Sequence, residues 1–211
     1  MPLDDRRVER LIPEKAGRPT LIHGNTQLLF GGMGRLSESS VINTKNKSFS
    51  ITSGIEAPDV GAKGVIVAQG ASIGGWSLYA HEGKLKYCYN VCGVQHFFTE
   101  ATSAIPSGTH QARIEYAHDG GELGKGGDVS LYIDGNQVGE GRVELTQPMI
   151  FSADETCDVC IDNASSVSPD YNPKSSAFNG TVNWVQIEVG KEDHDHLISP
   201  DERFTVAMAR Q

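Results

Sequence analysis

Hydrophobic and polar residues alternate with a period of two over most of the chain between His23 and Gly190. This period is typical of β-strands, because successive side chains of a strand point to opposite faces of its sheet. Glycine-rich turns separate the alternating segments, as in GVIVAQG, GGWSLYAHEGKLKYCYNVCG, GTHQARIEYAHDGG and GGDVSLYIDGNQVGEGRV. We therefore predict an antiparallel all-β fold, which offers few places for the strand-to-helix active sites of α/β enzymes.

Several strands can be placed by residue number. Residues 48–56 alternate as a strand, and Val65–Ala68 is short and wholly apolar, which is typical of a strand buried on both faces. Ile133-Asp134-Gly135-Asn136 contains the Asp-Gly pair of a tight hairpin turn. Eight or more such strands predict two packed antiparallel sheets, a β-sandwich of jelly-roll type. In the last predicted strand, 181–189, the pattern does not decide which of three residues face the core, Val182, Trp184 or Val185.

Three parts of the chain can be distinguished. Residues 1–22 are polar and interrupted by proline, which favours a lead-in or linker, and residues 23–190 form the predicted β-sandwich domain. Residues 191–211 form a linker and a short helix. Ser199-Pro200-Asp201-Glu202 combines a capping box with proline at the first helical position. We expect this helix, which runs to about Arg210, to dock on the sandwich or on a partner.

The composition narrows the classes of partner. The chain has 211 residues, enough for the core of one sandwich with short appendages. Its formal net charge is −9, whereas nucleic acids and anionic membranes bind basic surfaces, so neither is expected as a partner. No apolar run approaches the roughly 20 residues of a transmembrane helix. The first residues, MPLDDRRVERLIPE, lack the apolar core of a secretory signal, and we expect a cytoplasmic location.

The four cysteines form two local pairs. Cys88 and Cys92 share a face of one predicted strand about 13 Å apart, too far to bridge each other. Cys157 and Cys160 have the C-x-x-C spacing of redox and zinc sites. A zinc site needs four ligands and a redox motif needs a following helix, and neither is evident in the sequence. We therefore interpret the cysteines as buried free thiols in a reducing compartment.

Two glycine-rich strings imitate enzyme motifs. Gly70–Gly74 matches the G-x-S-x-G nucleophile elbow around Ser72, but a predicted strand follows it where the elbow requires a helix. A hairpin turn is the better interpretation. Gly120–Gly127 resembles a phosphate loop around Lys125, but Gly126 follows the lysine where the motif requires serine or threonine. We interpret this segment as a connection between strands, with Lys125 at a rim.

The segment from Val143 to Pro173 contains no lysine or arginine but six carboxylates, Glu144, Asp154, Glu155, Asp158, Asp162 and Asp170. Clustered carboxylates either stay solvated or bind a hard cation, and calcium takes six to eight oxygen ligands in flexible geometry. The spacing of an EF-hand is absent. One interpretation is a calcium ion held by four of these residues, Asp154, Glu155, Asp158 and Asp162, and the alternative is a solvated loop.

Aromatic and histidine residues also allow two interpretations each. An aromatic platform for a sugar can be drawn from Trp76, Tyr79, Tyr87 and Tyr89. On this interpretation Trp76, Tyr89 and Lys125 form a ligand rim. The alternative is that Trp76 and Trp184 anchor the core, because the chain has few other large side chains. His194-Asp195-His196 can ligate a transition metal, although such a pair in a polar linker is usually solvated.

Several long strings resemble the C-terminal region of bacterial arylsulfatases of the alkaline-phosphatase superfamily. They are LLFGGMGRLSESSVINTKNKS, GVIVAQGASIGGWSLY, KYCYNVCG, DGGELGKGGDVSLYIDG, FSADET and DHDHLISPDERFTVAMARQ. The resemblance covers nearly the whole chain and its strings are ungapped. The second half, with LYIDGNQVG, also resembles sandwiches of the concanavalin A-like and laminin-G-like type, in which calcium is often held at a rim.

The resemblance implies a module without its own catalytic machinery. In that family a C-x-P-x-R or S-x-P-x-R string supplies the formylglycine that attacks sulfate, and this chain contains neither string. We therefore expect a noncatalytic accessory module whose partner is a sulfatase catalytic domain, in cis or in trans. The alternative is a free-standing lectin-like module that binds a glycan through a calcium-bridged rim. A third interpretation is a hydrolase that uses Ser72 or an acid pair.

Overall fold

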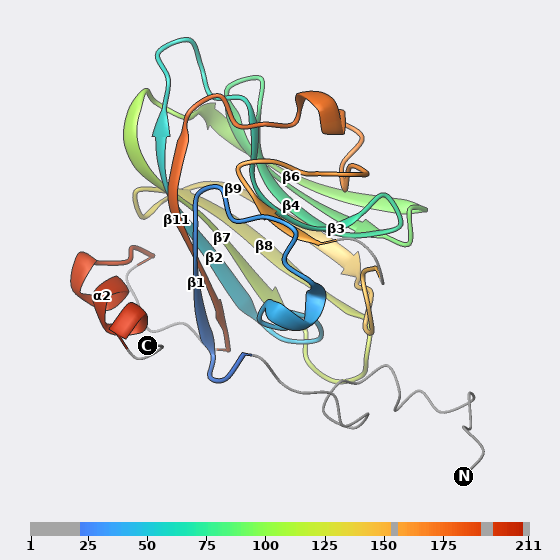
Figure 1. The fold of residues 1–211 in the computed structure, drawn as a ribbon. Coiled ribbons are helices and arrows are strands. Elements are labelled where there is room, and N and C mark those ends of the chain that lie inside the picture. The colour runs from blue at the N-terminus through green and yellow to red at the C-terminus, as the bar shows by residue number, and fades with distance from the viewer. Residues whose placement is uncertain (1–21, 153–155, 191–195, 209–211) are drawn as a thin grey trace.

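The chain folds into two antiparallel sheets that lie face to face (Figure 1). The computed structural model describes residues 22–152, 156–190 and 196–208. The β-sandwich predicted from the alternating pattern is confirmed, with a short C-terminal helix beside it. Among the described residues, no helix is both long and apolar enough to cross a membrane.

One sheet has six strands and the other has five. The six-stranded sheet has the spatial order β1 (Thr26–Phe30), β11 (Thr181–Val189), β2 (Phe49–Ala57), β7 (Gly108–His118), β8 (Lys125–Ile133) and β9 (Asn136–Leu145). The five-stranded sheet has the order β10 (Cys157–Val159), β3 (Gly64–Ala71), β4 (Gly74–His81), β5 (Lys84–Val91) and β6 (Gln95–Ala104). The helical elements are η2 (Glu38–Ser40), η3 (Pro173–Ser175) and α2 (Pro200–Met208).

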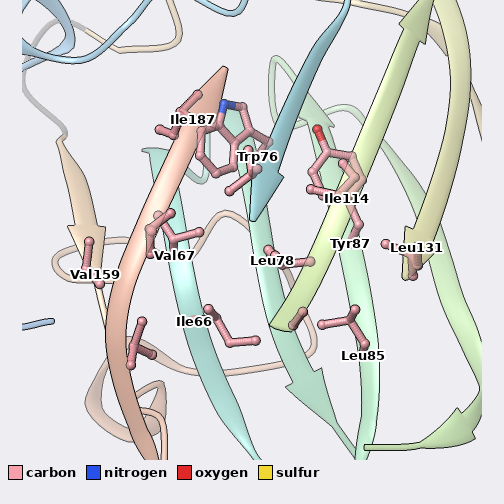
Figure 2. Packing of buried hydrophobic residues seen from close by; sticks show 14 of the residues in the cluster. Ile66, Val67, Trp76, Leu78, Leu85, Tyr87, Ile114, Leu131, Val159 and Ile187 are labelled. Atoms are coloured by element: carbon pink, nitrogen blue, oxygen red, sulfur yellow. The ribbon is translucent and has the colours of Figure 1, made fainter. Parts of the chain in front are cut away.

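The hydrophobic core fills the space between the two sheets (Figure 2). Trp76 and Leu78 come from β4 and Ile114 from β7, and none of the three has exposed surface. Alternate residues of each strand contribute to this core, as the period of two requires. Burial of such large apolar side chains is the main source of stability in a sandwich of this kind.

Two local predictions are confirmed in the strands. All eight residues of β3 are buried, which confirms that the wholly apolar segment is covered on both faces. β8 and β9 are joined by the tight turn at Asp134 and Gly135, whose φ angles are 50° and 77°. Positive φ at both central residues is the geometry that an Asp-Gly hairpin turn provides.

An irregularity in β11 determines which of its residues face the core. The pairing of β11 with β2 shifts register between Val182 and Trp184, at Asn183. The extra residue lets Val182 and Val185 both enter the core, while Trp184 points to the opposite face. Trp184 is buried, but it does not belong to the core between the sheets, so its assignment as a core anchor was wrong.

The capping box of the C-terminal helix is confirmed. The Ser199 backbone N–H donates to Glu202 Oε2 at 2.6 Å, and the Glu202 N–H donates to Ser199 Oγ at 3.3 Å. Pro200 is the first residue of α2, which lies beside β1 (Figure 1). The predicted lead-in, 1–22, falls almost entirely outside the described residues.

Candidate functional site

The two strings that imitate enzyme motifs lie between strands. Ser72 occupies the turn between β3 and β4, where its N–H donates to Ser165 Oγ at 3.2 Å. A strand follows this serine, so the strand-to-helix geometry of a nucleophile elbow is not formed, and the hairpin-turn prediction is confirmed. In the second string, residues 120–124 connect β7 to β8 and residues 125–127 begin β8, which confirms a connection between strands.

The predicted calcium ligands separate into two groups. Asp154 and Glu155 lie outside the described residues, whereas Asp158 and Asp162 are 3% and 2% exposed. Asp158 Oδ1 accepts hydrogen bonds from the Arg35 N–H at 2.7 Å and from a neighbouring asparagine side chain at 2.9 Å. Within the described ranges, no three His, Cys, Asp or Glu side chains form a group that could hold a metal ion. Calcium binding therefore stays a prediction.

Asp162 fastens a long loop to the outer face of the five-stranded sheet. Its Oδ2 accepts hydrogen bonds from the Val167 N–H at 2.9 Å and from the Tyr171 hydroxyl at 2.6 Å. Burial, together with the nearby Asp162 carboxylate, raises the pKa of Tyr171, so this hydroxyl stays protonated and can donate. The same hydroxyl also contacts Ser77 Oγ on β4 at 2.8 Å. The carboxylate thus has a structural role that needs no cation.

A second carboxylate of this loop forms an ion pair with the sheet. Asp170 Oδ2 lies 2.8 Å from Lys86 Nζ and accepts a hydrogen bond from the Tyr79 hydroxyl at 2.6 Å. Burial alone would raise the pKa of Asp170, but the hydrogen bonds from Lys86 and Tyr79 outweigh it, and the net pKa lies below its ordinary value. The charged form of Asp170 therefore stabilises the folded chain.

Because of this ion pair, we expect the folded chain to lose stability in acid. An aspartate whose pKa is lowered on folding contributes its full stabilisation above the unfolded pKa of about 3.9 and loses it as the pH falls through the folded value. We expect Asp170→Asn to cost up to about 1 kcal/mol at pH 7, because the pair is partly solvated. Urea unfolding at several pH values checks this, and the difference from wild type should shrink below about pH 4. A constant difference down to pH 3 would contradict it.

The three residues of the predicted ligand rim do not come together at a surface. Trp76 has no exposed surface and Tyr89 is 3% exposed, because both point into the core. The Tyr89 hydroxyl accepts a hydrogen bond from the Gln147 N–H at 3.1 Å. Lys125 is exposed at the first residue of β8. The core interpretation of Trp76 is thus the correct one.

The cysteine interpretation is confirmed in part. Cys88 and Cys157 are buried, and burial raises the pKa of Cys88 to about 12, so its thiol is neutral at physiological pH. Cys160 is partly exposed, and Cys92 is exposed. Cys92 does not share a face of β5 with Cys88, because that strand ends at Val91 and Cys92 adopts a turn conformation with φ 54°.

The sequence analysis did not predict the group of polar and aromatic side chains on the outer face of the six-stranded sheet. Along β7, Ala112 and Ile114 point into the core, so Gln111, Arg113 and Glu115 point to the other face. We call this surface the outer sheet face and define it by Thr52, Gln111, Arg113, Glu115, Tyr132, Trp184 and Gln186.

Arg113 lies at the centre of the outer sheet face and has no exposed surface. Its Nε donates to Glu115 Oε1 at 2.8 Å, and its Nη1 donates to the Thr52 hydroxyl. A buried guanidinium is costly unless it is paired and hydrogen-bonded, which explains this arrangement. Trp184 lies across β2 at Gly54, where any Cβ would overlap the indole ring.

The C-terminal segment covers this surface. We call residues His196–Met208 the C-terminal strap. The His196 ring stacks on Tyr132 with 4.4 Å between ring centroids and 10° between the planes, and its Nδ1 lies 2.5 Å from Glu115 Oε1. Ile198, which is 1% exposed, donates its N–H to Gln111 Oε1 and accepts from Gln111 Nε2 at 2.9 and 2.8 Å. The sequence interpretation of His194-Asp195-His196, as a metal site or a solvated linker, falls partly outside the described residues, which resume at His196.

Two further features belong to this region. The Arg203 guanidinium of α2 lies 4.5 Å above the Trp184 ring. Glu115, whose carboxylate contacts His196, also lines an open depression of about 270 Å³. The other lining residues are Ser48, Phe49, Ser50, Tyr116, Ala117, Glu188 and Gly190. The outer sheet face thus combines two aromatic rings with amide, guanidinium and carboxylate groups, which are groups that recognise polar ligands.

No protein-family model matches the chain, and no curated protein matches its sequence. Among solved structures, the CBM40 module of Ruminococcus gnavus IT-sialidase bound to α2,3-sialyllactose matches 89% of this chain and 99% of its own, with 10% identity and a TM-score of 0.47. The SAP-like pentraxin of Limulus polyphemus matches 79% of this chain and 78% of its own, with 14% identity and a TM-score of 0.44.

Domains LG4-5 of the mouse laminin α1 chain match 82% of this chain and 44% of their own length, with 14% identity and a TM-score of 0.44. Each of these three TM-scores is below 0.5. At identities of 10% and 14%, these similarities concern the fold alone.

Proposed function

We propose that the chain is a noncatalytic accessory module that packs against the α/β catalytic domain of an arylsulfatase. The resemblance of six ungapped strings to arylsulfatase C-terminal regions supports this partner. The chain has neither a C-x-P-x-R nor an S-x-P-x-R string, so a separate domain has to supply the formylglycine nucleophile. The module would contribute binding surface and contacts between domains.

The exposed face of α2 is the observation that carries this proposal. Phe204 and Met208 lie one helical turn apart and are 66% and 51% exposed. The neighbouring Arg203 is directed to the sheet, where it stacks on Trp184. The helix is therefore fixed in place by its inner side while it presents an apolar pair to a partner. Exposed apolar residues grouped in this way are typical of interaction surfaces.

Placing charge on the apolar pair tests the docking role. We expect Phe204→Asp with Met208→Asp to weaken binding to a C-x-P-x-R sulfatase domain at least tenfold, because burying charge in an apolar interface costs more than the 1.4 kcal/mol that a tenfold change represents. The measurement is calorimetric titration with a purified C-x-P-x-R sulfatase domain. Val60→Asp is the matched control, since Val60 is 88% exposed and lies far from α2 in the sequence. Equal binding by all three chains would exclude α2 as the docking element.

A second candidate function is glycan binding by a lectin-like module. The outer sheet face favours it, because Tyr132 and Trp184 offer flat rings and Gln111 offers an amide. Aromatic rings with a few directed polar groups are typical of sites for small ligands. In the present arrangement His196 and Arg203 cover both rings, so a glycan would have to displace the C-terminal strap.

A further inference from the structure

The outer sheet face holds the C-terminal strap through four separate contacts, each made by a side chain of the sheet. Tyr132 stacks on the ring of His196, and Glu115 meets the nitrogen of the same ring. Gln111 binds both backbone groups of Ile198. Trp184, on β11, holds the guanidinium of Arg203. Together these contacts recognise a histidine ring, the backbone groups of one residue and the guanidinium of a helical arginine.

The strap can leave this surface without unpairing a strand. It belongs to neither sheet, since the six-stranded sheet ends at β1 and β9 and the five-stranded sheet at β10 and β6. The backbone of the strap is held at Ile198 by a side chain and not by a ladder of main-chain hydrogen bonds. None of the strap side chains that the structure describes belongs to the core between the two sheets. Both sheets therefore keep their pairing when the outer sheet face is open.

From these contacts we infer that the outer sheet face is a peptide-binding site that accepts the C-terminal strap of a second copy of this chain. The chemistry of the site fits this occupant, because the Glu115 carboxylate contacts the ring nitrogen of His196 and the π-face of Trp184 faces the cation of Arg203. A strap from another copy makes the same contacts, so its exchange is the low-cost route to a dimer known as domain swapping. The exchanged helix would carry Phe204 and Met208 to the other copy.

Concentration decides which strap occupies the site. A strap on the same chain acts at an effective concentration in the millimolar range, so the wild-type chain closes on itself at micromolar concentration. A strap from a second copy binds when the chain's own strap is disabled. Complementation between two defective full-length chains therefore reveals the site in trans.

The experiment mixes two variants. The first, Ile198→Asp, has an intact outer sheet face and a disabled strap, because a carboxylate cannot replace the 1% exposed Ile198 side chain without large cost. The second, Gln111→Ala with Tyr132→Ala, has an intact strap and a disabled face. We expect each variant alone to be monomeric at 100 µM. We expect an equimolar mixture to contain heterodimer with twice the 22.7 kDa mass of the chain, as measured by light scattering.

A third substitution shows which contact joins the copies. Arg203→Ala, placed in the chain with the disabled face, should weaken the heterodimer about fivefold, because a cation over an indole ring contributes roughly 1 kcal/mol. The same substitution in the Ile198→Asp chain is the matched control and should have no effect. Urea unfolding confirms that each variant folds, and Gln111→Ala alone replaces the double variant if that one does not. A mixture of folded variants that stays monomeric at 100 µM overturns the inference.

Discussion

Replacing Trp76 by alanine should lower the free energy of unfolding by about 3–5 kcal/mol, the usual cost of removing a large aromatic side chain from a packed core. Trp76 has no exposed surface and lies between the sheets with Leu78 and Ile114 (Figure 2). The loss comes from the missing apolar contacts and from the cavity that remains. Urea unfolding at pH 7 followed by circular dichroism measures it.

Trp184→Ala is the matched control, since it removes the same side chain from the other face of the six-stranded sheet. It should cost less, because Trp184 contacts the strap and not the core between the sheets. It should also release Arg203 and increase proteolysis within the strap. A stability loss below 1 kcal/mol for Trp76→Ala would mean that this residue does not anchor the core.

Most of the fold follows from rules that act over a few residues. Alternation with glycine turns located the strands, the Asp-Gly pair located the hairpin at Asp134, and the capping box located the start of α2. Each of these signals is local, because it depends on backbone conformation or on which face a side chain occupies. Trp184 was misplaced because one extra residue, Asn183, reverses the alternation inside β11. A bulge leaves no clear mark in a single sequence.

The outer sheet face was missed for a different reason. Gln111, Arg113 and Glu115 alternate with apolar residues, as the solvent face of any strand does. Arg113 is buried and the other two residues are half-buried. The strap that contacts Gln111 and Glu115 returns about eighty positions later along the chain, and no local rule relates the two segments. Only the charge of Arg113 gave a signal, because an arginine at the centre of a six-stranded sheet is costly if covered and unpaired. Sequence alone did not show that it is covered.

The acidic segment illustrates how the same residues support two chemistries. Their grouping without any lysine or arginine suggested a hard cation, which carboxylates attract. In the folded chain, Asp158 and Asp162 accept hydrogen bonds from backbone N–H groups and side chains within reach, and Asp170 pairs with Lys86. Backbone N–H donors and a lysine stabilise these carboxylates, and a count of acidic residues in the sequence does not reveal such neighbours. Charge patterns therefore predict a site only when the donors nearby are known.

Asp162→Ala should lower the free energy of unfolding by about 2–3 kcal/mol in chelator and by the same amount in millimolar calcium. Its removal leaves the buried Val167 N–H without its acceptor, which costs roughly 1–3 kcal/mol. It also removes the hydrogen bond from the Tyr171 hydroxyl to a carboxylate, so that this hydroxyl keeps only the contact with Ser77. Thermal and urea unfolding of both chains, with and without calcium, measures the effect. Asp59→Ala is the matched control, since Asp59 is exposed and its loss should stay within about 0.5 kcal/mol.

The calcium dependence separates the two roles of this carboxylate. A cation that binds only the folded state raises the unfolding midpoint by mass action. If calcium raises the midpoint of wild type by several degrees and not that of Asp162→Ala, the carboxylate is a cation ligand, and glycan binding through a calcium-bridged rim becomes the leading function. Equal losses in both conditions assign Asp162 to the loop that it fastens. In that case the exposed pair on α2 remains the proposed docking surface.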